Sequence, residues 1–177
     1  MSKKSVALLA GLTFAAVALA GCGSDTKEAV KAGAEVGPQG SACPMPVTFS
    51  AAEKWGAATA EQDFTTGGVK LLCEIDAKPA GSVGFIRVWQ AAGVTDAKAA
   101  LEKFTSGEIG RGQKYTAGPL SGSEVEYVKG SDSPARALAV PAGGGIVIVS
   151  VGALSKDLFE KNLPAYELAK SSIKATA

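Results

Sequence analysis

Three β-rich runs in the second half of the chain follow one another with very short connections. They cover residues 124–129 (EVEYVK), 135–140 (ARALAV) and 145–151 (GIVIVSV), separated by turns rich in Gly, Ser and Pro. A parallel crossover needs a dozen or more residues, so strands joined this closely must be antiparallel. Two earlier runs, 68–75 and 82–90, flank the turn sequence KPAG and predict another hairpin. The chain is therefore expected to build an antiparallel sheet.

Two segments with helical periodicity complete the expected fold. Thr95 precedes a stretch whose apolar residues share one stripe, which predicts a capped amphipathic helix. The closing segment from Ser155 is also helical in pattern, with a break expected at Pro164, where a second helix would begin. This order predicts an α+β fold, in which a single sheet of about five to seven strands carries two main helices.

The composition excludes several kinds of chemistry. The 177 residues contain no histidine, which rules out Ser-His-Asp and Cys-His catalysis and imidazole ligation of metals. Lys and Arg number 18 and Asp and Glu 17, so no excess of positive charge indicates a nucleic-acid partner. We expect a single globular domain that is not an enzyme and carries no cofactor or metal.

The N-terminus has the organisation of an export signal. Two lysines precede an uncharged, mostly apolar run at 6–19, which is shorter than the roughly 20 apolar residues of a spanning helix. The run ends in LAGC, residues 19–22, which resembles the lipobox of bacterial lipoprotein signal peptides at all four positions. This resemblance implies cleavage between Gly21 and Cys22, a diacylglycerol on the Cys22 thiol, and attachment to the extracytoplasmic face of the cell membrane.

The next segment is predicted to be a tether. Residues 22–42 lack aromatic side chains and combine Gly, Ser, Pro and mixed charges, which is typical of a flexible linker, here with a transient helix over 27–35. The pattern changes at Cys43. A short strand is expected at 46–49, followed by a helical turn at 50–53, which has capping-box spacing. The globular domain is thus predicted to cover 43–177, after a signal peptide at 1–21.

Two cysteines remain after lipidation of Cys22. Cys43 and Cys73 would lie in a compartment where disulfides persist, which favours a bridge between them. Closing a loop of about 30 residues would stabilise the fold by roughly 3 to 4 kcal/mol in the chain-entropy model. The alternative is two buried free thiols, whereas a redox pair is disfavoured because Cys-x-x-Cys spacing is lacking.

One predicted strand concentrates the scarce aromatic residues. Within 82–90, Phe85, Arg87 and Trp89 alternate onto one face. Aromatic and Arg side chains dominate interface hot spots, so this face is a candidate surface for a ligand or protein partner. In the alternative interpretation, Trp89 belongs to the core and Arg87 extends its charge to the edge.

Three other patterns offer weaker candidates for chemistry. Two pairs of carboxylates, at positions 74 and 76 and at 124 and 126, each lie on one face of a predicted strand. Such a pair can act as general acid and base on a glycan, or its members can be ordinary side chains on a solvent-exposed strand face. A Ser-x-x-Lys spacing at 171–174 lacks the partner motifs of penicillin-binding enzymes. A basic Gly-rich stretch at 107–114 follows a predicted helix, whereas a phosphate cradle would open one.

The element order, closed by a helix ending in Ser172-Ile173-Lys174, resembles the PsbP and Ran-binding Mog-type fold. The run CEIDAKPAGSVGFIRVWQ, an Ala-rich helix and PAYELAK resemble small uncharacterised envelope lipoproteins of high-GC Gram-positive bacteria. These resemblances imply an accessory or binding protein, anchored by lipid on Cys22, whose partner is an envelope protein or a small ligand. The alternatives are a small-molecule or lipid carrier with a pocket beside Trp89, and a carboxylate-dependent hydrolase.

Overall fold

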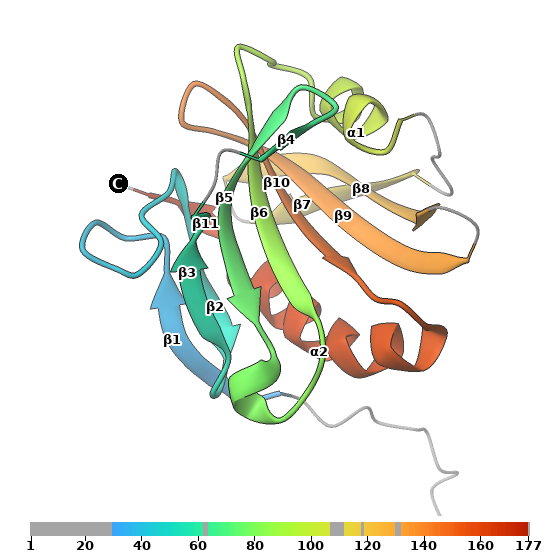
Figure 1. Ribbon diagram of the computed structural model, residues 1–177. Coiled ribbons are helices and arrows are strands. Elements are labelled where there is room, and N and C mark those ends of the chain that lie inside the picture. Colours follow the sequence, from blue (N-terminus) through green and yellow to red (C-terminus); the bar gives the residue numbers. More distant parts are fainter. Residues whose placement is uncertain (1–29, 62–63, 107–111, 118, 130–131, 177) are drawn as a thin grey trace, which may run out of the picture.

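The computed structural model describes residues 30–61, 64–106, 112–117, 119–129 and 132–176 (Figure 1). These residues form one large sheet, one small sheet, two α-helices and a 3-10 helix. The large sheet has the order β3-β5-β6-β10-β9-β8-β7, with β4 paired to β5. Its strands are β3 (Gly56–Thr59), β4 (Thr65–Thr66), β5 (Val69–Asp76), β6 (Phe85–Ala92), β7 (Gly112–Ala117), β8 (Leu120–Lys129), β9 (Ser133–Ala142) and β10 (Gly145–Gly152). Within the described parts of the chain, neither α-helix has the length and hydrophobicity of a membrane-spanning segment.

All pairings within the large sheet are antiparallel, as the short turns predicted. The tight hairpin between β9 and β10 places Gly143 at φ 60° and Gly144 at φ 73°. A two-residue turn of this handedness needs positive φ at both positions, which glycine adopts without steric cost. The α+β class and antiparallel pairing are thus confirmed.

The prediction of a single sheet with five to seven strands was wrong. The large sheet has eight strands, and a second sheet of three contains β1 (Ala32–Val36), β2 (Val47–Ala52) and β11 (Lys174–Ala175). Most of the missed strands are short or carry mainly exposed residues, so they lack the alternation that marks a half-buried strand. Their partners in the sheet, rather than their own sequences, determine their conformation.

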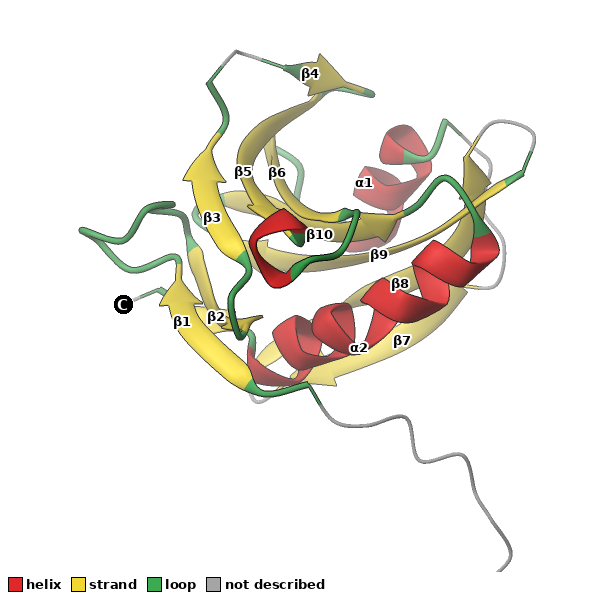
Figure 2. Cartoon of the chain, turned by 60° about the horizontal axis from the view of Figure 1, so that its bottom comes forward, coloured by secondary structure: helices red, strands yellow, loops and turns green. Residues whose placement is uncertain are grey.

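The two faces of the large sheet are covered unequally. Helix α2 (Lys156–Ser172) and the small sheet pack on one face, around a core that includes Tyr166, Phe49 and Leu138. The shorter α1 (Ala97–Phe104) packs on the other, around Leu101 and Trp89. Figures 1 and 2 show a strongly curved sheet with α1 on its concave side. Because α1 is only eight residues long, part of the concave face has no helix above it.

Helix α2 is continuous, so the break predicted at Pro164 was wrong. Ser155 caps the helix, its hydroxyl accepting a hydrogen bond from the Leu158 amide at 3.3 Å. Pro164 lies inside and removes one backbone hydrogen bond. The residues just after it, including Tyr166, are buried against the sheet, and this burial offsets the local cost.

Two other local predictions need correction. Helix α1 is capped by Asp96, one residue later than the predicted Thr95. The Asp96 carboxylate accepts a hydrogen bond from the Ala99 amide at 2.6 Å. The helical turn predicted at 50–53 is wrong, because residues 50–52 are the end of β2 and Glu53 begins the turn that follows it. There the Ser50 amide donates to the Ser172 hydroxyl at 2.9 Å, which ties β2 to the end of α2.

The folded body begins earlier in the chain than the predicted boundary at Cys43. Strand β1 (Ala32–Val36) pairs with β2, and Val36 is buried, so the folded body begins well before Cys43 and the helix predicted at 27–35 is replaced by strand from Ala32 onward. The disulfide Cys43–Cys73, with a Cα–Cα distance of 5.8 Å, fastens this segment to β5. The signal sequence and Cys22 lie outside the described residues.

Candidate functional site

An open recess occupies the concave face where α1 does not cover it. It consists of two adjoining lobes of about 570 and 590 Å³, which share Arg87, Trp89, Phe104, Tyr127 and Lys129 as lining residues. Volumes of this size are typical of small-molecule sites. We name them the Phe64 lobe, lined also by Thr59, Glu61, Phe64, Thr66, Glu74 and Thr105, and the Phe85 lobe, lined also by Val83, Phe85, Pro134, Ala135, Gly152, Leu154 and Leu158.

The Phe85 lobe exists because the central strands carry small side chains there. Ser150 and Gly152 on β10 and Ala135 on β9 form its floor, and the register places Gly152 directly beside Ala135. Larger side chains from β6 and β8 stand on either side of this floor. The hollow therefore arises from the sequence of β9 and β10 together with the curvature of the sheet.

A row of aromatic rings crosses the recess. The ring centroids are 5.9 Å apart between Phe64 and Trp89, 5.3 Å between Trp89 and Phe104, and 6.3 Å between Phe104 and Tyr127. Tilted and edge-on rings at these distances attract one another. The row joins the segment before β4 to β6, α1 and β8 and gives the recess a rigid aromatic wall.

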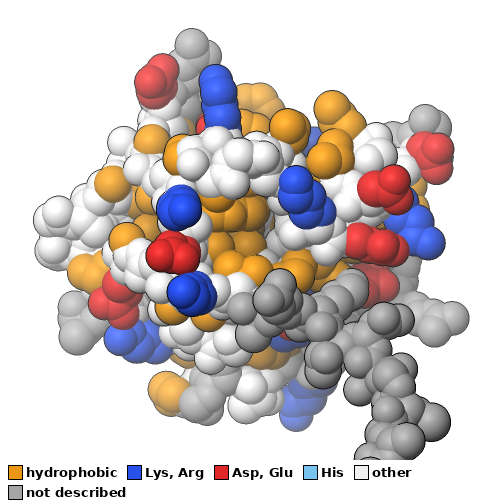
Figure 3. Space-filling model, turned by 90° about the horizontal axis from the view of Figure 1, so that it is seen from below, with side chains coloured by type: hydrophobic (Ala, Val, Ile, Leu, Met, Phe, Trp, Pro, Cys, Tyr) orange, Lys and Arg blue, Asp and Glu red, His pale blue; other side chains and the backbone are white. Residues whose placement is uncertain are grey.

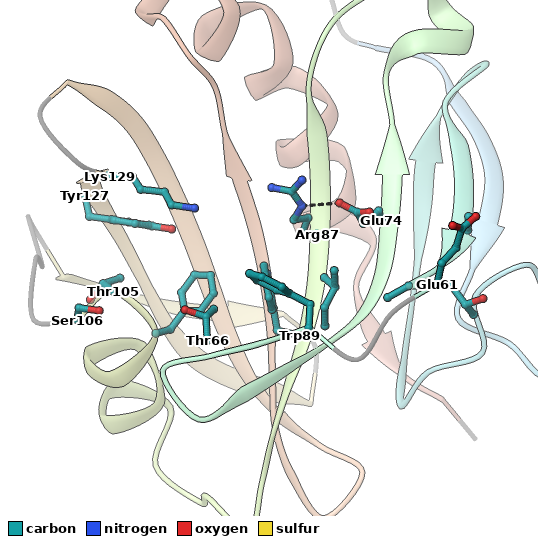
Figure 4. Close-up of a pocket in the computed structure, with 15 residues that line it drawn as sticks. Glu61, Thr66, Glu74, Arg87, Trp89, Thr105, Ser106, Tyr127 and Lys129 are labelled. Atoms are coloured by element: carbon teal, nitrogen blue, oxygen red, sulfur yellow. Dashed lines mark hydrogen bonds and ion pairs between the residues drawn. The ribbon is translucent and has the colours of Figure 1, made fainter.

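Trp89 and Arg87 are both held by specific contacts. The indole Nε1 of Trp89 donates to the Ser150 hydroxyl at 2.9 Å. Nε of Arg87 donates to Glu74 Oε1 at 2.6 Å, and its guanidinium carbon lies 4.9 Å from the centre of the Phe85 ring. Figure 4 shows the free end of Arg87 pointing away from Glu74, towards the side of the recess that carries Lys129 and Tyr127.

The structure brings the predicted face of Phe85, Arg87 and Trp89 into this recess. Trp89 is only 5% exposed, so it is a core residue, as the alternative interpretation held, and its edge also lines the recess. Arg87 does not lie at an edge of the sheet, because it is paired with Glu74 across two inner strands.

Sequence reasoning missed Phe104, Lys129 and Phe64 as lining residues. Phe104 is the last residue of α1, at the point where the apolar face of the helix meets the recess. The alternation on β8 puts Tyr127 and Lys129 on one face, but only the folded sheet shows that this face is the concave one.

The two carboxylates of the pair on β8, Glu124 and Glu126, contact different partners. Glu124 is buried, accepts a hydrogen bond from the Tyr166 hydroxyl at 2.9 Å, and pairs with Lys170 at 3.0 Å. Glu126 pairs instead with Arg136 at the surface. Burial, and then the charge of Glu124, raise the pKa of Tyr166 well above its ordinary value. The contacts of Glu124 with Tyr166 and Lys170 tie α2 to the sheet.

The remaining candidates are also engaged in local structure. Glu74 pairs with Arg87, while Asp76 accepts a hydrogen bond from the backbone of Lys78 at 2.8 Å. In the Ser-x-x-Lys pattern, Ser171 bonds to the Leu168 carbonyl and Lys174 pairs with Glu35. Most of the Gly-rich stretch 107–114 lies outside the described residues, and its end belongs to β7. In the described part of the chain, no three potential metal-ligating side chains form a group.

Comparison with known proteins supports the fold. The solution structure of cyanobacterial PsbP (CyanoP) from Synechocystis sp. PCC 6803 is similar, with a TM-score of 0.54 and 10% sequence identity, over 73% of this chain and 86% of that one. At this identity the likeness concerns the fold alone. No curated protein sequence matches the chain. A family model described as "uncharacterised lipoprotein" matches residues 15–173, and the chain therefore belongs to this lipoprotein family.

Proposed function

We propose that this protein is a lipid-anchored binding protein of the cell envelope, whose recess takes up a small amphipathic anion. Membership of a lipoprotein family and the LAGC sequence at 19–22 support the anchor on Cys22 and the extracytoplasmic location. The recess favours the small ligand, one of the two partners expected from the sequence.

The observation that carries this proposal is the chemistry of the Phe85 lobe. Its described lining includes Lys129 and Arg87 and no Asp or Glu, and Glu74, which pairs with Arg87, lines the adjoining lobe. Most of the rest is apolar, with Phe85, Leu154 and Leu158 among the larger side chains. An anionic group beside the two cations, joined to an apolar chain along the lobe, would satisfy both features.

The cations are suited to different parts of this task. Arg87 is oriented by Glu74 before any ligand arrives, so little side-chain entropy would be lost when its free end binds an anion. Lys129 makes no ion pair within the described residues and is exposed. Its positive charge is available to a ligand entering the recess.

Native mass spectrometry of the lipidated protein, released from its native host membrane into a mild volatile detergent, tests the proposal. We expect an added mass that survives gentle desolvation and disappears on denaturation, in excess of the mass of the anchor. The variant Gly152→Leu, which fills the lobe, should lose it. Equal retention of the adduct by wild type and variant would contradict binding in the Phe85 lobe.

The anchor has a separate test. The variant Cys22→Ser should leave the protein unprocessed or release it from the membrane fraction, because the thiol that carries the lipid is gone. Continued membrane association of a correctly cleaved variant would contradict lipidation at Cys22.

A further inference from the structure

We infer that the mouth of the Phe85 lobe rests on the surface of the bilayer that holds the anchor, so that the recess opens towards the lipid. This inference depends on the proposed lipid on Cys22. It concerns the orientation of the folded body and the surface that faces the membrane. It does not depend on which ligand the recess binds.

The sheet register gathers three chain segments at one end of the molecule. Phe85 at the start of β6 pairs with Gly152 at the end of β10, and Gly152 pairs with Ala135 near the start of β9. The segments that precede β6, follow β10 and precede β9 must therefore emerge side by side. Val83 and Leu154 lie in the first two of these segments, and both line the Phe85 lobe.

The two apolar side chains at this mouth are unusually exposed. Val83 is 62% and Leu154 is 86% exposed. Single exposed apolar residues are common, but here two of the most exposed ones flank the opening of one recess. Figure 3 shows the molecule from below, where hydrophobic side chains lie at the surface among charged ones.

The mouth segments are fixed to the body of the protein. Asn162 of α2 donates a hydrogen bond to the Val83 carbonyl at 2.9 Å. The neighbouring Gly84 has φ 144°, and a Cβ there would lie 2.0 Å from the Asn162 side chain. Leu154 directly precedes Ser155, the N-cap of α2. Both apolar side chains therefore project from backbone segments that these contacts hold in place.

The chain enters the fold at the same end. Ala32 pairs with Ala52, and the next strand begins at Gly56, which pairs with Asp76. Asp76 in turn pairs with Phe85 at the mouth. Figure 1 shows the beginnings of β1 and β6 at the bottom of the molecule.

The short segment between Cys22 and the folded body limits how the body can be oriented on the membrane. Residues 22–29 separate the lipidated cysteine from the first described residue, and eight residues span at most about 29 Å when fully extended. A folded body of this size is roughly 40 Å across. The end of the molecule at which β1 begins, which is also the end that carries the mouth, therefore stays closer to the membrane than the opposite end of the sheet.

The charged side chains at this end of the molecule do not favour a purely electrostatic contact with the membrane. The exposed groups at this end include Lys78, Lys129 and Lys156 but also Asp132 and Asp157, so neither sign dominates. Apolar insertion of Val83 and Leu154, supported by the anchor, is the contact that these side chains allow. The docking should accordingly be insensitive to salt.

Hydrogen exchange of the lipidated protein in vesicles of phosphatidylcholine and phosphatidylglycerol tests the orientation. Amides of 81–85 and 152–156 should exchange at least about fivefold more slowly than in the unlipidated chain in solution, at low and high salt. Amides of 92–95 and 142–145, at the other end of the sheet, should not change. Equal rates at the mouth, or protection confined to the opposite end, would overturn the inference.

A matched pair of variants makes the test specific. Leu154→Asp should remove most of the protection at the mouth, whereas Ala92→Asp, at the exposed far end of β6, should retain it. Failure of the anchor itself would appear earlier, as loss of co-sedimentation with vesicles. Failure of ligand binding would leave the protection intact, so the three outcomes can be told apart.

Discussion

Trp89 and Ser150 are joined across β6 and β10 by a hydrogen bond of 2.9 Å from the indole nitrogen to the hydroxyl. This bond satisfies the polar edge of an otherwise buried ring and fixes the plane of Trp89 at the centre of the recess. The same hydroxyl lies 3.5 Å from the Arg87 carbonyl, so one small side chain connects two residues of the site to the central strand.

Replacing Ser150 with alanine should leave the indole N–H of Trp89 buried without a partner. The expected loss of stability is about 1 to 3 kcal/mol, the usual cost of such a group. Urea denaturation would measure it. Ser121→Ala, at an exposed position of β8, is the control and should change stability by less than about 0.5 kcal/mol. Equal effects of the two variants would show that the bond contributes nothing.

Neutralising Lys129 should weaken binding of an anionic amphiphile. For Lys129→Gln we expect a two- to fivefold rise in the Kd of oleate, corresponding to about 0.5 to 1 kcal/mol for a partly solvated charge pair. The uncharged methyl oleate should be unaffected. Lys98→Gln on α1, at an exposed side chain that lines neither lobe, is the matched control. An equal effect on both probes would exclude an ionic contact at Lys129.

Filling the Phe85 lobe should weaken binding strongly while leaving the fold intact. A Cβ on Gly152 would meet the Ala135 side chain at 3.6 Å, an ordinary contact, so a larger residue can project into the lobe without displacing the backbone. Gly152→Leu is expected to raise the Kd of oleate at least about tenfold, with an unchanged thermal unfolding midpoint. Undiminished affinity would place the ligand elsewhere.

The contact between Tyr166 and Glu124 should make the protein sensitive to alkali. Because burial and the nearby carboxylate raise the pKa of Tyr166, the unfolded chain releases this proton near pH 10 while the folded protein still holds it. The stabilisation is complete below pH 10 and is lost as pH rises towards the folded pKa, by at most about 1.4 kcal/mol per pH unit.

Denaturation at a series of pH values from 8 to beyond 10 would show this decline. Tyr166→Phe should flatten it, although that variant will also be less stable near neutral pH, because Glu124 loses a buried hydrogen-bond donor. An identical decline in both proteins would assign the alkaline sensitivity to other groups.

The strongest local patterns predicted the centre of the fold well. The run GIVIVSV has the composition of a strand buried on both faces, and its hairpin with β9 followed from the glycines between them. The pairing of Cys43 with Cys73 also agrees with the structure. In contrast, AGAEV and GQKYTA became strands through their partners, and their own composition favours loops.

The recess could be predicted only in part for a related reason. Alternation places Phe85, Arg87 and Trp89 on one face, which is a local property of the strand. The hollow itself depends on the curvature of the sheet, on small residues in two other strands and on the short reach of α1. These are properties of the assembled layers, so no single segment of the sequence carries them.

The most direct test of binding in the recess uses Trp89 as the reporter. In a Trp55→Phe variant, Trp89 is the one remaining tryptophan, and a dibrominated stearate bound in the Phe85 lobe should quench its fluorescence saturably and be displaced by oleate. In the Trp89→Phe variant the remaining Trp55, which does not line either lobe, should not be quenched saturably. Absence of saturable quenching of Trp89, or equal quenching of Trp55, would contradict the proposed site.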